Sequence, residues 1–298
     1  MDRKDDLQNW LLLGLLTLIW GTSYILIKKA LVVFSPVQVA AARVSISFLA
    51  CIPFYIPALR AIPRGKYHHL LFLGVISIFV PAFLFAYSQT RINSAVSGII
   101  NSLSPLFTVL TGLVIWRVQT PAMKVVGVLI GLLGAIVLVF GKSGFDMNGD
   151  MIYALMPVVA TLFYGLNSNY VKQHFTGTNP LYVTALSIGF IGIPAALILF
   201  STDFIARVEG TGGLQGLGCV SCLAIFGTVS GWLIFYRLIQ RRDPLFAASV
   251  TYLVPIVAIG WGLRDGETLN IYHGIGMLLI LAGVYFVSSA KKSTVPKL

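Results

Sequence analysis

The sequence contains few charged residues, and this scarcity excludes most soluble folds. Only 10% of its 298 residues are Asp, Glu, Lys or Arg, whereas 57% are hydrophobic. Soluble domains carry about 25% charged residues. The mean hydropathy of +0.88 leads to the same conclusion. Apolar runs of about 20 residues alternate with short polar connections, which is typical of membrane-spanning helices and not of the short alternating strands of a membrane β-barrel.

Cysteine and histidine are also scarce, which argues against a metal or redox centre. The three cysteines all fall in apolar runs, and Cys219 and Cys222 have no second pair of possible ligands nearby. Buried thiols are therefore the better interpretation. A lipid-processing enzyme or intramembrane hydrolase would need catalytic groups clustered in or beside its spans, and the four histidines are scattered at predicted span ends. The sequence predicts neither a cofactor nor an enzyme.

Apolar runs predict ten membrane spans. They cover residues 10–29, 36–57, 70–90, 94–116, 122–141, 150–171, 180–200, 216–239, 244–263 and 272–290. If the N-terminus lies inside, most of the 21 Lys and Arg residues fall in cytoplasmic segments. The positive-inside rule then places both termini in the cytoplasm, as an even number of spans requires. The net charge of +11 therefore reflects topology, and no nucleic-acid partner is expected.

The two halves of the sequence repeat the same short motifs. Trp20-Gly21 matches Tyr164-Gly165, and Leu103-x-Pro105 matches Leu253-x-Pro255, at offsets of about 144 to 150 residues. Because each half carries five spans, the second half must be inverted relative to the first. We expect repeats at 1–145 and 146–298, in an all-α integral membrane protein whose ten transmembrane helices form two inverted five-helix repeats. Inverted repeats around a central site are the architecture of secondary transporters.

Repeat-related prolines and glycines predict bends and close packing. Pro105 and Pro255 are expected to bend spans four and nine, because proline removes a backbone hydrogen bond. Three glycines of span five form a small-residue face that should pack closely against another helix. The last span, around Gly276 and Gly283, is the candidate partner. The glycines of span five are Gly127, Gly131 and Gly134.

Several motifs, taken in order, resemble a known transporter family. They are Trp20-Gly21, Arg43, Leu103-x-Pro105, Glu267 followed by Gly276, and the Gly-x6-Gly pair near the end of each half. From Trp10 to Val287 the chain resembles the EamA-type transporters of the drug/metabolite transporter superfamily, in particular their amino-acid exporter branch. The resemblance implies a ten-helix bundle that moves small metabolites outward. The chain departs from the family's pattern at Val118, where an acidic residue would match Glu267.

Spans one and six carry matching polar and aromatic faces, which are candidates for the substrate cavity. Trp20, Ser23 and Tyr24 lie at i, i+3 and i+4 and therefore share one side of a helix. The alternative is that the aromatic rings anchor the helices at the membrane interface. The repeat counterparts on span six are Tyr164, Asn167 and Ser168.

Further candidates lie on spans three, four, eight and nine. Span four carries a polar stripe from which Ser97 and Asn101 are chosen, although the serines can equally serve close helix packing. Aromatic side chains make a ring-lined cavity plausible, suited to substrates with a hydrophobic body. The aromatic candidates are Phe79, Phe83, Tyr87, Trp232 and Tyr252.

Arg43 stands alone inside span two, and its repeat counterpart is the neutral Ser187. An Arg at the centre of a membrane helix costs about 2.5–3.5 kcal/mol on insertion scales. Arg43 can dock a substrate carboxylate, gate the exit path, or cap backbone carbonyls while reaching outward. The sequence leaves these alternatives open.

None of the ten acidic residues lies in the interior of a predicted span, and only Asp150 stands at the first residue of one. Proton and sodium antiporters commonly bind their ion at an embedded carboxylate. We therefore expect facilitated transport, or coupling through Glu267 or Asp243, both expected to be exposed. The predicted function is export of small amphipathic metabolites across the inner membrane by alternating access. Amino acids, including aromatic or other apolar ones, are the first candidates; purines, nucleotide sugars and metallophores are alternatives that would need more than one embedded cation. Beyond the small-molecule substrate and the lipid bilayer no partner is expected, because ten spans can enclose a pathway in one monomer.

Overall fold

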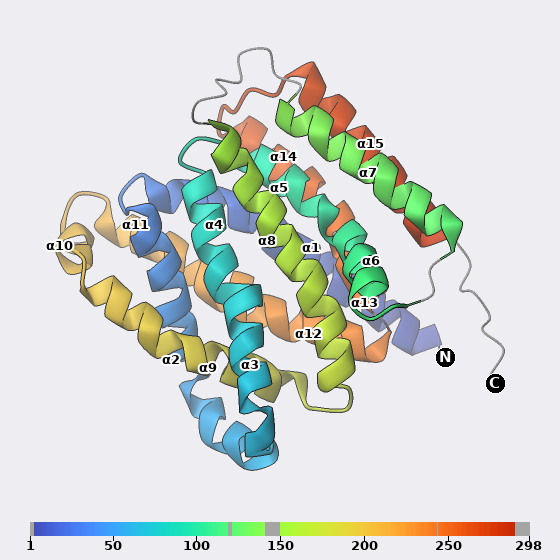
Figure 1. Ribbon diagram of the computed structural model, residues 1–298. Helices are drawn as coiled ribbons and strands as arrows, with labels where there is room; N and C mark the ends of the chain where they lie inside the picture. Colours follow the sequence, from blue (N-terminus) through green and yellow to red (C-terminus); the bar gives the residue numbers. More distant parts are fainter. Residues whose placement is uncertain (1–2, 119–120, 141–149, 243, 290–298) are drawn as a thin grey trace.

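The computed structural model describes residues 3–118, 121–140, 150–242 and 244–289 (Figure 1). Every regular element in these ranges is helical. The repeat boundary expected between residues 145 and 146, like the possible coupling residue Asp243, lies outside the described residues.

The first half supplies five helical stretches, two of which change helix type along their length. They are α1 (Arg3–Leu31), α2 (Pro36–Ala61), α3–η2–α4 (Tyr67–Gly74, Val75–Phe79, Val80–Ser88), α5–η3–α6 (Ser94–Ile100, Asn101–Leu103, Ser104–Val114) and α7 (Ala122–Phe140), with a single turn η1 (Arg64–Lys66) before α3.

The second half follows the same order. Its stretches are α8 (Asp150–His174), α9 (Pro180–Phe200), α11–η4–α12 (Gly213–Cys222, Leu223–Ser230, Gly231–Arg241), α13–η5–α14 (Pro244–Ala248, Ser249–Tyr252, Val254–Arg264) and α15 (Ile271–Ser289). The connector expected over residues 201–215 contains a short helix that was not predicted, α10 (Phe204–Glu209).

The backbone irregularities repeat together with the sequence motifs. Spans three and eight each contain a π-helical segment, η2 and η4. Spans four and nine each contain a 3-10 segment, η3 and η5, that ends just before Pro105 and Pro255. Proline cannot donate a backbone hydrogen bond, and its ring crowds the preceding turn, so the tighter helix type lies where a bend is expected.

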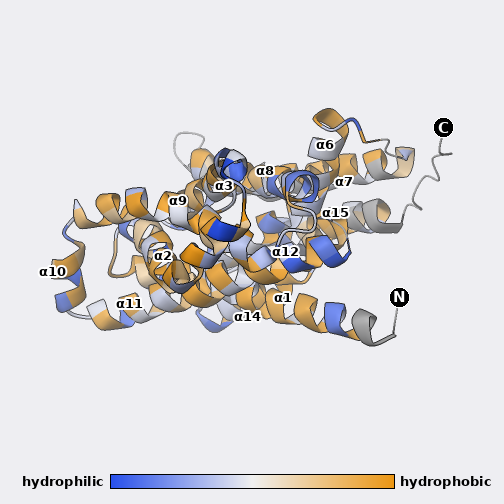
Figure 2. Cartoon of the chain, turned by 90° about the horizontal axis from the view of Figure 1, so that it is seen from below, coloured by the Kyte–Doolittle hydropathy of each residue, from blue (hydrophilic) through white to orange (hydrophobic). Residues whose placement is uncertain are grey.

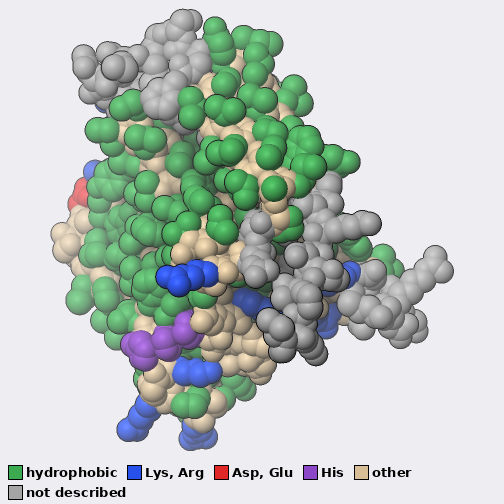
Figure 3. All heavy atoms as spheres, turned by 45° about the vertical axis from the view of Figure 1, so that its right-hand side comes forward, with side chains coloured by type: hydrophobic (Ala, Val, Ile, Leu, Met, Phe, Trp, Pro, Cys, Tyr) green, Lys and Arg blue, Asp and Glu red, His purple; other side chains and the backbone are tan. Residues whose placement is uncertain are grey.

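The predicted all-α membrane fold is confirmed. Within the described ranges, eight helical stretches are long and apolar enough to cross a membrane. The two remaining predicted spans correspond to α7 and α15, each of 19 residues. Figure 2 shows hydrophobic residues along most of each helix. Figure 3 shows a broad hydrophobic face, with Lys, Arg and His side chains gathered toward one end of it.

Contacts at one end of the bundle join the start of α1 to the end of α8. Arg241, in the last turn of α12, donates from Nη1 to Oε1 of Gln8 at 2.7 Å. The neighbouring Gln240 donates from Nε2 to the carbonyl oxygens of Phe175 and Thr178, which follow α8, at 3.2 and 2.6 Å. We call this region, formed by these five residues, the Gln240 end.

At the opposite end, the last turn of α1 and the start of α8 lie in one region. The Nζ atom of Lys28 is 2.9 Å from Oε1 of Glu267, and that carboxylate also accepts the backbone N–H of Ser94 at 3.0 Å. The guanidinium of Arg91 lies over the ring of Tyr153 in the first turn of α8, at 6.0 Å. We call this region the Glu267 end. α1 begins at the Gln240 end and ends at the Glu267 end, whereas α8 begins at the Glu267 end and ends at the Gln240 end. The two halves are therefore antiparallel.

The helices α7 and α15 form a pair at the side of the bundle (Figure 1). A Cβ atom on Gly134 would lie 2.8 Å from the carbonyl oxygen of Gly276. One on Gly283 would lie 2.5 Å from the carbonyl oxygen of Gly127. The close packing predicted between the glycines of span five and the last span is confirmed, because only a hydrogen at these positions lets the two backbones touch.

Candidate substrate-binding cavity

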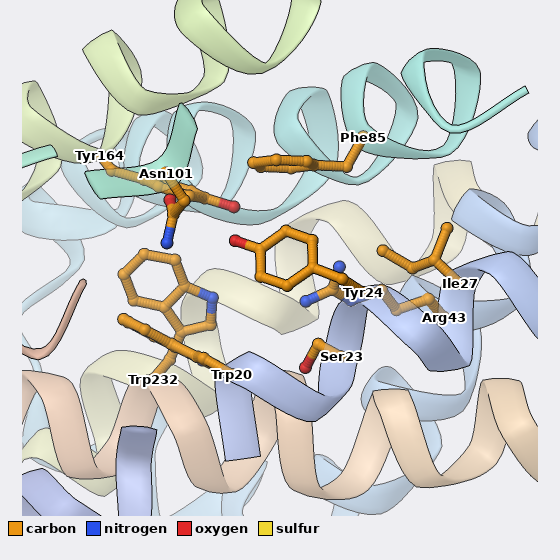
Figure 4. A pocket seen from close by; sticks show the side chains of 9 residues that line it. All are labelled: Trp20, Ser23, Tyr24, Ile27, Arg43, Phe85, Asn101, Tyr164 and Trp232. Atoms are coloured by element: carbon orange, nitrogen blue, oxygen red, sulfur yellow. The ribbon is translucent and has the colours of Figure 1, made fainter. Parts of the chain in front are cut away.

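A cavity lies between the two halves, away from both ends (Figure 4). Side chains of both repeats form its wall. They are Trp20, Ser23, Tyr24, Ile27, Arg43, Phe85, Asn101, Tyr164 and Trp232. The centre of a water molecule can move through about 30 Å³ of it. A single water needs about 10–15 Å³, so the cavity has room for two or three waters.

Each half contributes an aromatic–glycine motif to the cavity, and the structure explains why the two residues stand together. A Cβ on Gly21 would lie 2.4 Å from Cβ of Val257 on α14, and one on Gly165 would lie 2.5 Å from the carbonyl carbon of Phe107 on α6. Gly21 therefore lets α1 pack closely against α14 of span nine. Gly165 likewise lets α8 pack closely against α6 of span four. The aromatic residue that precedes it faces the cavity.

Trp20 is held against span eight by a hydrogen bond to the backbone. Its Nε1 donates to the carbonyl oxygen of Gly227 at 3.0 Å, and its ring lies 5.5 Å from that of Trp232. Gly227 belongs to the π-helical segment η4. A Cβ on Gly231 would lie 2.5 Å from the same Nε1 atom. The indole position thus depends on the absence of a side chain at residue 231.

Aromatic rings line much of the cavity and contact one another in series. The ring centroids are 5.7 Å apart for Tyr24 and Phe85, 6.2 Å for Phe85 and Tyr164, and 5.5 Å for Tyr164 and Trp232. Aromatic pairs are favourable at about 4.5–7 Å. Figure 4 shows the hydroxyl groups of Tyr24 and Tyr164 directed toward the same space, beside the amide of Asn101. The wall is therefore largely apolar, with a few polar groups among the rings.

Arg43 extends from α2 into this cavity and not toward the membrane surface, so the outward-reaching alternative is wrong. Its Nε donates to Oγ1 of Thr228 at 2.7 Å. That hydroxyl in turn donates to the carbonyl oxygen of Leu223 at 3.3 Å, five residues earlier, which the π-helical geometry of η4 makes available. Within the described ranges, none of the ion pairs involves Arg43.

Glu267 was expected to be exposed, and this expectation is wrong. Its side chain is only 3% exposed. The carboxylate accepts hydrogen bonds from the Ser94 hydroxyl at 2.7 Å and from the backbone N–H of Ala95 at 3.0 Å, at the start of α5. Burial raises the pKa of Glu267, but the hydrogen bonds from Ala95, Lys28 and Ser94 together lower it by more. The net pKa therefore lies below the usual value. These contacts compensate for the burial of its charge.

Between the cavity and the Gln240 end, neutral polar groups connect three helices. The hydroxyl of Tyr236 donates to Oδ1 of Asn167 at 3.2 Å and lies 3.4 Å from Oγ of Ser77. All three residues are buried. The Nδ2 atom of Asn167 has no hydrogen-bond partner among the described residues. The contacts on the two sides of the cavity therefore differ. Ion pairs are present at the Glu267 end, and neutral hydrogen bonds are present between the cavity and the Gln240 end.

The structure brings seven of the predicted site residues together around the cavity. These are Trp20, Ser23, Tyr24, Arg43, Asn101, Tyr164 and Trp232. The other seven lie elsewhere in the described chain: Phe79, Phe83, Tyr87, Ser97, Asn167, Ser168 and Tyr252.

Each residue outside the cavity has another environment. The rings of Phe79 and Phe83 contact each other at 5.0 Å and pack against the main core. Tyr87 is 38% exposed, and Tyr252 packs against a second, smaller core. Ser168 donates to the carbonyl oxygen of its own helix at 2.8 Å. The other two are Ser97, which is buried, and Asn167, described above.

Two residues of the cavity wall were missed. Ile27 lies seven positions after Trp20 and three after Tyr24, so helical periodicity already placed it on the predicted face. Phe85 carried no such signal. The π-helical segment η2 precedes it and changes the angle between successive side chains, so a regular helix does not predict which residues of α4 face the cavity.

Comparisons with known proteins agree with this architecture. The chain is 25% identical over 284 residues (94% of this chain, 99% of the relative) to an uncharacterized transporter of Archaeoglobus fulgidus. It is 25% identical over 284 residues (93% and 89%) to an uncharacterized inner membrane transporter of Escherichia coli. It is also 26% identical over 298 residues (96% and 95%) to a protein of Salmonella typhimurium named "Probable amino-acid metabolite efflux pump".

A crystal structure of another protein has the same fold, with a TM-score of 0.64 over 94% of this chain and 96% of the other, at 17% identity. Residues 8–140 and 151–289 each match the sequence profile of the EamA-like transporter family. These two matches correspond to the two antiparallel halves. The chain is a multi-pass membrane protein that belongs to the EamA-like transporter family.

Proposed function

We propose that this transporter exports small amphipathic metabolites by alternating access, with amino acids that carry aromatic or other apolar side chains as the first candidates. One observation carries the proposal: both antiparallel halves direct an aromatic residue of the same motif into one cavity, beside a lone guanidinium. A cavity between inverted repeats serves alternating access, because rocking one half against the other exposes it to either side in turn.

The chemistry of the wall supports an amphipathic substrate. The rings of Tyr164, Trp232 and Phe85 offer apolar contact to a hydrophobic body. The guanidinium of Arg43 offers charge-assisted hydrogen bonds to a carboxylate. The relative in Salmonella typhimurium named as an amino-acid metabolite efflux pump supports the same class of cargo.

Charge distribution and relatives support the proposed orientation and location. Most Lys and Arg residues belong to segments that a cytoplasmic N-terminus would place inside. The Gln240 end is then cytoplasmic and the Glu267 end faces outward. The Escherichia coli relative named as an inner membrane transporter supports insertion in the inner membrane. We infer a functional monomer, because the cavity is formed within one chain.

Transport requires the cavity to expand. Ligand pockets usually enclose about 300–1,000 Å³, and this cavity has room for only two or three waters. The aromatic rings must therefore separate when a metabolite enters. The π-helical segment η4 contacts both Trp20 and Arg43, and η2 directly precedes α4, which carries Phe85, so the irregular backbone is placed where movement is needed.

Growth and flux assays test this function. Cells that express the chain are grown on a panel of toxic amino-acid analogues, and efflux of radiolabelled substrate is measured for any analogue to which they become resistant. Cells that express Trp20→Ala or Tyr164→Ala are expected to lose resistance. Their efflux rate should fall by at least about tenfold. Tyr87→Ala is the matched control, because its ring is 38% exposed and lies outside the cavity. Equal loss in all three variants, or resistance that survives the cavity substitutions, would contradict the proposal.

A further inference from the structure

The charges around the cavity are unbalanced. Of the nine residues that line it, Arg43 alone is charged, and its observed partner is the neutral hydroxyl of Thr228. A guanidinium stays protonated in proteins, so this charge does not disappear by loss of a proton. Across the described ranges, no carboxylate forms an ion pair with it.

The described carboxylates that form ion pairs are already neutralised elsewhere. Glu267 and Asp265 accept from Lys28 at 2.9 and 2.8 Å at the Glu267 end. Asp203 pairs with Arg207 at 2.8 Å on the surface. The positive charge of the cavity is therefore left for the ligand to neutralise, and burying it unpaired in a membrane is unfavourable.

Two kinds of amphipathic carboxylate affect this charge differently. A monocarboxylate without an ionised amino group brings one negative charge, and the cavity becomes neutral. A zwitterionic α-amino acid leaves the total at +1. Its ammonium group sits on the same carbon as its carboxylate, so it must approach Arg43 whenever the carboxylate binds there. The aromatic rings attract the ammonium group of the amino acid. This attraction is weaker than the repulsion between that ammonium group and the nearby guanidinium of Arg43.

We propose that the preferred substrates are amphipathic monocarboxylates of net charge −1, with an aromatic or other apolar body and no ionised amino group. This inference rests on the proposed function: it keeps export of amphipathic metabolites but puts monoanionic carboxylates in place of zwitterionic amino acids as the first candidates. It also supplies a driving force. Among the acidic residues that the structure describes, none lies within a membrane-spanning helix, where a coupling proton or sodium ion would be bound. A monoanion needs no such ion, because the negative interior potential of a cell drives anions outward.

Binding to the purified full-length protein gives the first test. Three probes share one phenyl body: 3-phenylpropanoate has only the carboxylate, phenylalanine has carboxylate and ammonium, and 2-phenylethylamine has only the ammonium. Trp20 and Trp232 lie in the cavity wall, so tryptophan fluorescence reports occupancy. We expect 3-phenylpropanoate to bind at least about tenfold more tightly than phenylalanine, and 2-phenylethylamine to bind most weakly.

Variants of the arginine test the cause of this order. Arg43→Gln is expected to weaken 3-phenylpropanoate binding by at least about tenfold and to remove its advantage over phenylalanine. Arg43→Lys keeps the charge and is expected to keep the order of the three probes, which guards against a variant that simply fails to fold. Phenylalanine binding as tightly as 3-phenylpropanoate to the unsubstituted protein would overturn the inference.

Transport gives the second test. In proteoliposomes with valinomycin, an inward-positive potential set by a potassium gradient of about thirtyfold should drive accumulation of 3-phenylpropanoate up to the same ratio. Liposomes with Arg43→Gln control for passive leak. Saturable transport of phenylalanine alone overturns this inference and leaves the proposed function standing. Failure to transport any of the three probes, together with no resistance in the growth assay, contradicts the proposed function itself.

Discussion

The Nζ atom of Lys28 lies 2.9 Å from Oε1 of Glu267, although 239 positions separate the two residues in the sequence. Lys28 lies in the last turn of α1 in the first repeat, and Glu267 follows α14 in the second. Glu267 also accepts the N–H groups of Ser94 and Ala95. One carboxylate therefore joins three spans at a single end of the cavity. Val118, the repeat-related position, carries no carboxylate with which to make such a link.

Breaking the Lys28–Glu267 pair should expose the cavity to the outside. The reporter is Ser23→Cys on a background in which Cys51, Cys219 and Cys222 are replaced. With Glu267→Gln added, we expect an impermeant thiol reagent outside the cell to label the reporter about tenfold faster, equivalent to about 1.4 kcal/mol. The reason is that the outward-open state no longer has to break an ion pair.

Asp203→Asn provides the matched control for that measurement. It removes an ion pair with Arg207 near the same end, where the Asp203 side chain is 60% exposed. Exposed pairs contribute little, so the labelling rate should change less than about twofold. Similar acceleration by both substitutions would show that the effect is not specific to the buried carboxylate.

The same carboxylate predicts how stability depends on pH. The pKa of Glu267 is lower in the folded protein than its ordinary 4.5. Such a group stabilises the folded state at pH above its unfolded pKa, and the contribution disappears as the pH falls through the folded value. The melting temperature in detergent should therefore be insensitive to this group between pH 8 and about 6, and should fall below about pH 4.5. Glu267→Gln should flatten the acidic part of the profile, and an unchanged profile would contradict the assignment.

A carboxylate that is already deprotonated at neutral pH is also poorly suited to carry a proton. Substrate uptake into proteoliposomes should therefore be insensitive to an imposed pH gradient near neutrality. Strong dependence on the gradient that survives Glu267→Gln would require another proton-binding group.

The contact between α7 and α15 should not tolerate a methyl group. In Gly134→Ala the added Cβ would lie 2.7 Å from the backbone nitrogen of Ile280 and 2.8 Å from the Gly276 oxygen. Backbone atoms cannot rotate away, so the helices must separate, at a cost of about 1–3 kcal/mol. Thermal unfolding should shift downward by several degrees. Gly274→Ala, on the partner helix α15, meets nothing within 4 Å and should leave the midpoint unchanged.

Gly231→Ala should disturb the cavity more than the fold. Its Cβ would lie 2.5 Å from Nε1 of Trp20, so the indole must turn and lose its hydrogen bond to Gly227. A neutral hydrogen bond contributes about 0.5–1.5 kcal/mol, so the KM for a transported substrate should rise about threefold to tenfold. Gly218→Ala, in the same span, meets nothing within 4 Å and is the control. An unchanged KM with a lowered melting temperature would assign Gly231 to packing alone.

Local signals in the sequence predicted much of the fold. The start of α2 is an example, because Ser35 accepts the N–H of Gln38 while the Gln38 side chain accepts the N–H of Ser35, directly before Pro36. Span positions were also predictable, because an apolar run of membrane length has no other environment available to it. The repeated motif beginning at Trp20 predicted which face of span one meets the cavity.

Other features depend on contacts between distant segments. The sequence shows a glutamate at 267, but its burial follows from the approach of Lys28 and α5. The choice of Phe85 over Tyr87 as a cavity residue follows from the π-helical segment before α4. Neither can be seen in a window of neighbouring residues.

The sequence by itself therefore determined the spans, the antiparallel halves and one face of the cavity. Hydrophobic length and charge bias act along the chain and need no tertiary contact. Only the tertiary structure decided which polar groups are paired. The energy of a buried charge depends on partners that the fold brings together, and so Glu267 is paired with Lys28 while Arg43 contacts the neutral hydroxyl of Thr228.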